Sequence, residues 1–212
     1  MACAICDTRR PRRFCPGVGG NICSWCCGNE REVTVDCPLD CEYLQEARKH
    51  EKPVPIEASE VPNRDIPLTE KFLHDNEELL AFLSAAILRT MMETPGVIDF
   101  DVREALEGLI RTYRTLQSGV YYESRPVNPI AVRIYAALQD ASAEYRKTEH
   151  EQFGITRTRD SDVLGMLVFL QHFELDQNNG RRRGRAFLDA LHRFYSPVPV
   201  PDVPPTSSLI LP

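Results

Sequence analysis

The feature that most constrains this chain is the placement of its cysteines. All eight lie within the first 41 residues, and the remaining 171 residues contain none. They are Cys3, Cys6, Cys15, Cys23, Cys26, Cys27, Cys37 and Cys41. Such clustering predicts a small cross-linked module in the first fifty residues, held together either by disulfides or by metal ions.

The absence of targeting signals favours metal over disulfides. The opening stretch, MACAICDTRRPRRFC, has no apolar segment and no small-residue cleavage site of a secretory signal. The longest strongly apolar stretch, 79–88, is about half as long as a bilayer-spanning helix. We therefore expect a cytoplasmic protein with no membrane partner, in which reduced cysteines bind zinc. A disulfide framework or an iron–sulfur cluster is the alternative.

Two CxxC pairs carry the first predicted zinc site. Cys3–Cys6 and Cys23–Cys26 are separated by 16 residues, a spacing at which two such pairs share one tetrahedral ion. Each pair forms a tight turn that points two thiolates at the metal. Cys27 leaves an alternative open, because Cys23 could pair with Cys27 instead of Cys26.

The other cysteines predict a second zinc. Cys15, Cys37, Cys41 and whichever of the doublet 26–27 is left over are its expected ligands, and a single zinc is the alternative. Cys41 lies at the start of a predicted helix, DCEYLQEARKH, where the helix dipole favours a thiolate. His50 lies nine residues beyond Cys41, a separation that favours a solvated histidine at a helix end over a ligand.

The spacing of the first five cysteine positions, Cys3-x2-Cys6-x8-Cys15-x7-Cys23-x2-Cys26, resembles that of the B-box and related cross-brace zinc fingers. The resemblance implies a treble-clef-like module in which interleaved pairs bind two zincs, and it implies a role in protein interaction. The family pattern places a ligand three residues after Cys15, where this chain has Val18, which leaves Cys27 to replace it. The closing pair, Cys37-x3-Cys41, differs from the RING pattern, so no ligase activity is carried over.

The rest of the chain is predicted to be helical. Residues 51–67 contain four prolines and predict a linker. Between 68 and 195, apolar residues recur at helical spacing in five segments, with Asp101, Asn128 and Ser161 as expected N-caps. The segment around 163–175 is apolar nearly all round and predicts a central helix. Six prolines in 196–212 predict a disordered tail. The expected fold class is mostly α: a small zinc-binding module at 1–50 followed by an all-α bundle, in which no segment has the pattern of a strand.

Charge and motifs limit the function classes. The chain carries 25 Lys plus Arg against 31 Asp plus Glu, and residues 1–50 are formally neutral, which disfavours general nucleic-acid coating. Trp25 lies inside the CSWC motif and is expected to pack structurally. No phosphate-binding loop, HExxH or GxSxG motif occurs, and all-cysteine ligation indicates a structural metal. We therefore expect a non-enzymatic adaptor or regulatory protein that binds another protein. The alternative is a nucleic-acid-binding regulator that uses the clusters Arg9–Arg13 and Arg181–Arg185.

Overall fold

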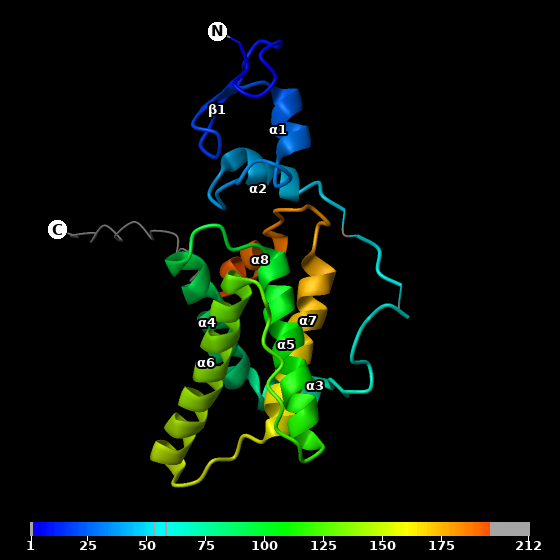
Figure 1. Cartoon of the computed structure of the whole chain (residues 1–212), viewed down its shortest axis with the longest axis vertical. Helices are drawn as coiled ribbons and strands as arrows, with labels where there is room; N and C mark the ends of the chain where they lie inside the picture. The colour runs from blue at the N-terminus through cyan, green and yellow to red at the C-terminus, as the bar shows by residue number, and fades with distance from the viewer. Residues whose placement is uncertain (1, 53, 58, 196–212) are drawn as a thin grey trace, which may run out of the picture.

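Two differently built parts follow one another along the chain, and both are seen in Figure 1. The structure is a computed structural model, and it describes residues 2–52, 54–57 and 59–195. A cysteine-rich part, called here the cysteine module (residues 2–50), lies at one end, and a bundle of α-helices forms the rest. The mostly α fold class is therefore confirmed. The predicted disordered tail, 196–212, lies outside the described residues.

The cysteine module contains a short hairpin and two short helices. Strands β1 (Arg13–Cys15) and β2 (Gly20–Ile22) pair antiparallel, with Phe14 opposite Asn21. Helix α1 (Ser24–Glu30) follows β2 directly. Helix α2 (Glu42–Arg48) confirms the helix predicted in the segment DCEYLQEARKH. The two short strands, β1 and β2, were not predicted from the sequence. Each strand has three residues and buries one of them, which is too short for a visible alternation of apolar and polar positions.

The bundle contains five long helices and the short α3. They are α3 (Glu70–Asp75), α4 (Glu77–Glu93), α5 (Asp99–Gln117), α6 (Pro129–Phe153), α7 (Asp160–Gln177) and α8 (Ala186–Tyr195). The last five correspond to the five predicted helical segments. Residues 163–168 of α7 are buried without interruption, which confirms that α7 is central. The core around it consists mainly of leucine, isoleucine, valine and alanine side chains.

One of the three predicted N-caps is confirmed. The side chain of Asn128 accepts a hydrogen bond from the amide of Ile130 at 3.0 Å and begins α6. Asp101 and Ser161 do not cap, because α5 and α7 begin before them. Instead, the carboxylates of Asp101 and Asp162 each accept a bond from the amide just before their helix, at 2.9 and 2.8 Å. In each helix an acidic side chain of the first turn therefore binds back to the amide of the residue before the helix, which is one half of a capping box.

The predicted linker, 51–67, runs along the outside of the bundle toward α3 (Figure 1). Its second half is held by side chains of α5 and α7. Arg114 donates to Asn63 at 2.9 Å and to Asp65 at 2.7 Å. His172 Nε2 donates to the carbonyl of Pro62 at 2.7 Å. His172 therefore has a structural role as a hydrogen-bonding residue beside the core.

The cysteine module is joined to the bundle by a buried polar contact. Glu32 follows α1 and is completely buried. Its carboxylate accepts bonds from Arg48 at 2.8 Å, from Asn179 at 2.9 Å and from the backbone amide of Arg185 at 3.0 Å. Its backbone carbonyl accepts a bond from the amide of Arg183 at 2.8 Å. The segment that connects α7 to α8 therefore holds the module on the bundle.

No helix in the described part of the chain combines the length and the apolar character needed to cross a membrane.

Candidate metal centre

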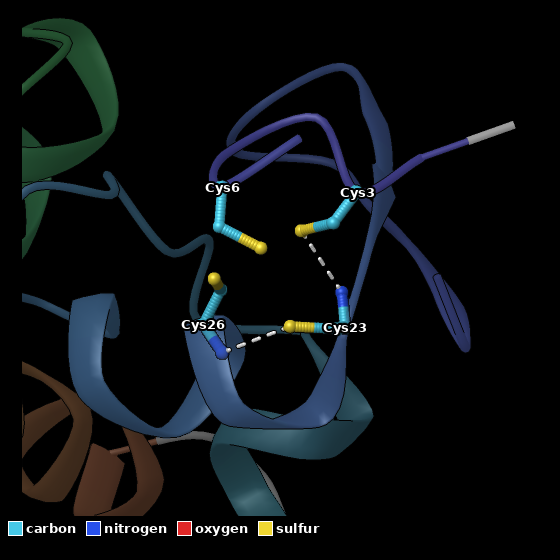
Figure 2. A group of neighbouring side chains, drawn as sticks. All are labelled: Cys3, Cys6, Cys23 and Cys26. Atoms are coloured by element: carbon cyan, nitrogen blue, oxygen red, sulfur yellow. Dashed lines mark hydrogen bonds between the residues drawn. The ribbon is translucent and has the colours of Figure 1, made fainter. Parts of the chain in front are cut away.

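Four cysteines form a compact group at the outer end of the cysteine module. These are Cys3, Cys6, Cys23 and Cys26, called here the first tetrad. Figure 2 shows their side chains converging from two turns, one near the chain start and one at the beginning of α1. The four Sγ atoms all lie within 4.8 Å of one another. Among the described residues, this is the one group of three or more metal-binding side chains whose ligand atoms lie this close together.

The local chain geometry explains this convergence. Cys23 is the N-cap of α1, and its sulfur accepts a bond from the amide of Cys26 at 3.4 Å. The amide of Cys23 in turn donates to Cys3 Sγ at 3.2 Å, which ties the two turns together. Asp7 closes the first turn with a positive φ of 52°. Amide donors aimed at sulfur are the usual surroundings of a zinc thiolate.

The first tetrad fits a tetrahedral zinc ion. Zinc–sulfur bonds of about 2.3 Å place the sulfurs of such a site about 3.8 Å apart, within the spread of these four thiols. Three of the side chains are buried, and the fourth, Cys6, is half-buried. The donor set is therefore complete and shielded from solvent, which is typical of a structural site.

The surroundings act unequally on the four thiols. Bonds from the hydroxyl of Thr8, 3.3 Å from Cys6 Sγ, and from nearby amides lower the pKa of Cys6 to about 5. Burial raises the pKa of Cys3, but backbone hydrogen bonds, among them that from Cys23, outweigh it and lower the pKa overall. Burial and the three neighbouring thiols raise the pKa of Cys26. Four thiolates at this separation repel one another, and a dication supplies the charge that lets all of them ionise together.

The remaining four cysteines line one small cavity deeper in the module. These are Cys15, Cys27, Cys37 and Cys41, called here the second tetrad. The cavity has a volume of about 20 Å³, which is room for a single ion or water. Its sulfurs are not drawn together as closely as those of the first tetrad. The side chain of Arg31 donates to Cys27 Sγ at 3.9 Å, and the backbone of Glu32 acts to lower the pKa of the Cys37 thiol, although burial raises that pKa overall.

The structure resolves the alternative at the cysteine doublet. Cys26 joins Cys3, Cys6 and Cys23, and Cys27 lies with the second tetrad. The reason is helical rotation, because consecutive residues of an α-helix point about 100° apart. The doublet in the first turn of α1 therefore serves both groups. A pair of adjacent cysteines at a helix start is the sequence signal that could have indicated this division.

His50 does not join either group of thiols. Its side chain is 78% exposed and lies 3.4 Å from Glu46. This is the solvated position that the sequence spacing favoured.

Burial has the largest single effect on the pKa of the Cys37 thiol in the second tetrad, and it raises that pKa.

The two arginine clusters have different surroundings. Arg181 pairs with Glu51 at 3.5 Å, and Arg185 pairs with Asp36 at 2.7 Å. Arg183 also contacts Asp36, at 3.3 Å. Three arginines of the second cluster therefore pair with carboxylates, Arg183 and Arg185 with Asp36 of the cysteine module and Arg181 with Glu51 just after it.

Trp25 corrects an expectation of the sequence. Its side chain is 55% exposed and does not pack in the core of the module. The guanidinium of Arg9 lies over its ring at 4.3 Å from the centroid. Trp25 lies in the first turn of α1 on the side away from the buried cysteines, so the CSWC motif buries its sulfurs and leaves the ring outside.

No protein-family model matches the chain, and neither a curated protein nor a solved structure shows significant similarity to it. The likeness to B-box fingers therefore rests on the cysteine spacing alone. What the structure supports is the coarser statement that a group of four cysteines is placed to bind a metal, as in a zinc finger.

Proposed function

We propose that this protein binds two structural zinc ions, one in each tetrad. The first tetrad carries the proposal, because its four sulfurs lie within 4.8 Å of one another with amide donors around them. Support for the second comes from the cavity that its four cysteines line. In chain order the two sets alternate, which matches the interleaved arrangement of cross-brace fingers.

Zinc accounts for how so small a module holds its shape. Its apolar core beyond the cysteines consists of few buried side chains, mainly Ile22, Val35 and Leu44. Metal binding supplies folding free energy that such a core does not provide. All-thiolate ligation leaves no open position for a substrate, so the ions are structural rather than catalytic. Reduced, metal-binding cysteines support the proposal that the protein works in the cytoplasm, where thiols stay reduced.

Metal analysis of single variants tests this proposal. Wild-type protein purified without chelator is expected to contain two zinc ions per chain. Cys6→Ser, in the first tetrad, and Cys41→Ser, in the second, are each expected to contain one. A wild-type protein with one zinc that Cys41→Ser retains would contradict the second site. Iron in place of zinc would contradict the identity of the metal.

We further propose that the protein is a non-enzymatic adaptor that binds a protein partner. Its cysteine module is held against the bundle through the buried carboxylate of Glu32, so that both parts are presented as one surface. The alternative, nucleic-acid binding through both clusters, Arg9–Arg13 and Arg181–Arg185, has less support because three arginines of the second cluster already pair with carboxylates. A purified partner that stays bound at high salt, and to a variant with these arginines neutralised, would support the adaptor role. Binding abolished by either change would contradict it.

A further inference from the structure

The described structure separates the charges of the cysteine module. Residues 1–50 are formally neutral. Two of their carboxylates, those of Glu32 and Asp36, bind Arg185 of the bundle part. No carboxylate among the described residues pairs with Arg9, Arg10 or Arg12. The segment from Asp7 to Arg13 carries four arginines against one carboxylate, although the chain as a whole is acidic.

This basic segment lies beside exposed aromatic rings. Trp25 is 55% exposed beneath the guanidinium of Arg9, and Phe14 is 59% exposed. Arg12 and Phe14 are two residues apart in extended chain, so their side chains lie on the same side of the hairpin. Arg10, between Arg9 and Arg12 in the sequence, is also exposed. We call Arg9, Arg10, Arg12, Phe14 and Trp25 the outer face.

An exposed ring and unpaired guanidinium groups together suit one class of ligand. Single-stranded nucleic acid is bound where bases stack on aromatic side chains and arginines contact the phosphates. An acidic peptide would use the arginines but leave the rings of Trp25 and Phe14 unused. A duplex hides its base faces, so it too would leave the rings unused. We propose that the outer face binds single-stranded nucleic acid.

The inference does not depend on the adaptor role or on the number of zinc ions. It requires only that the cysteine module is folded. It also differs from the alternative based on both arginine clusters, because Arg181, Arg183 and Arg185 face the module.

Trp25 makes the proposal directly measurable, since it is the one tryptophan of the chain. Full-length, metal-loaded protein is titrated with a 20-mer of deoxythymidine at several salt concentrations. We expect Trp25 fluorescence to be quenched as a base stacks on its ring. We also expect the affinity to fall as salt rises, with a slope of about −2 for three phosphate contacts. The same sequence in a duplex is expected to bind more weakly.

Matched variants locate the binding surface. With a fluorescently labelled 20-mer, the double variant Arg10→Ala/Arg12→Ala is expected to bind about tenfold more weakly. Arg182→Ala is the control, because Arg182 is likewise exposed but belongs to the other cluster. It is expected to bind as the wild type does. Unchanged metal content in each variant shows that the module is still folded.

Three results would overturn the proposal. The first is no binding to the 20-mer at low salt. The second is an equal loss of affinity per charge removed in Arg182→Ala, which would show general attraction to a polyanion. The third is tight binding of a poly-glutamate peptide that displaces the 20-mer while Trp25 fluorescence stays unchanged, which would identify an acidic protein ligand instead.

Discussion

The carboxylate of Glu32 accepts a hydrogen bond from the backbone amide of Arg185 at 3.0 Å, across 153 residues of sequence. Glu32 also has a positive φ of 51°, a conformation that few non-glycine residues adopt. Its surroundings hold it there, because the side chain also receives bonds from Arg48 and Asn179. This contact makes the attachment of the cysteine module a specific polar interaction rather than an apolar one.

Removing the Glu32 carboxylate should destabilise the protein strongly. Glu32→Ala leaves the side chain of Arg48, itself only 6% exposed, without its main partner. Breaking one side of a buried ion pair costs about 3 kcal/mol of unfolding free energy, which urea denaturation measures. Glu46→Ala is the control, because Glu46 is an exposed carboxylate of the same module. An equally small effect of both substitutions would contradict the role of Glu32.

Metal loss from the second tetrad should release this contact. The loop that carries Glu32 lies between Cys27 and Cys37 of the second tetrad, and the Glu32 backbone is close enough to the Cys37 thiol to act on its pKa. In Cys41→Ser we therefore expect faster hydrogen exchange at the amides of Arg183 and Arg185, which donate to Glu32.

The same experiment contains its own control. The amides of Phe187 and Leu188 donate to the Asp99 carboxylate inside the bundle, at 3.0 and 3.1 Å, and should stay protected. Cys6→Ser, in the first tetrad, should affect the amides of residues 183 and 185 less than Cys41→Ser does. Loss of protection at Phe187 as well would indicate unfolding of the bundle, and equal protection in both variants would contradict the coupling.

Gly17 should be essential for the fold of the second tetrad. A Cβ added at Gly17 would collide with the backbone carbonyl of Asp36 and approach the side chain of Val35 within 2.9 Å. Gly17→Ala is therefore expected to destabilise the module by about 1–3 kcal/mol. At Gly28, in α1, an added Cβ meets nothing within 4 Å. Gly28→Ala is expected to stabilise by roughly 0.5–1 kcal/mol, and urea denaturation of both variants checks the contrast.

Cysteine spacing and helical periodicity predicted much of this molecule. The CxxC pairs at Cys3 and Cys23 indicated the first tetrad, because a tight turn between two thiols is a local property of the chain. The same holds for the long helices, whose apolar residues recur every three to four positions. The N-cap at Asn128 was predictable for the same reason, since a cap and the proline after it are neighbours in sequence.

Contacts between distant residues were not predictable. Nothing adjacent to Glu32 indicates that it is buried against Arg48 and Asn179, because these partners lie 16 and 147 residues away and polar contacts leave no periodic pattern. The ion pair of Arg185 with Asp36 likewise has no local signal in the sequence. The exposure of Trp25 was missed because burial of a motif's cysteines does not determine where the residue between them points.

Stability should depend on pH through Asp99. Burial raises the pKa of this carboxyl to about 7, against the bonds from the amides of Phe187 and Leu188. Because the folded pKa is raised above that of the unfolded chain, the folded state binds more protons between about pH 4 and pH 7. The stability that protonated Asp99 contributes is fully present below about pH 4 and is lost as pH rises through about 7.

The variant Asp99→Asn isolates this effect from others that titrate. Its side chain does not ionise, so the difference in urea midpoint between the wild type and Asp99→Asn should change between pH 5 and pH 7.5. The wild type should lose stability relative to the variant as pH rises, by a few kcal/mol at most. A difference that stays constant over this range would show that Asp99 keeps the same charge when the protein unfolds.

The most direct test of the account is native mass spectrometry of the full chain, purified without chelator or exposure to affinity metal. We predict a mass with two zinc ions and all eight cysteines protected from alkylation until the metal is removed. A metal-free protein whose mass is lower by two hydrogens for each pair of cysteines would contradict it, because the two tetrads would then be held by disulfides.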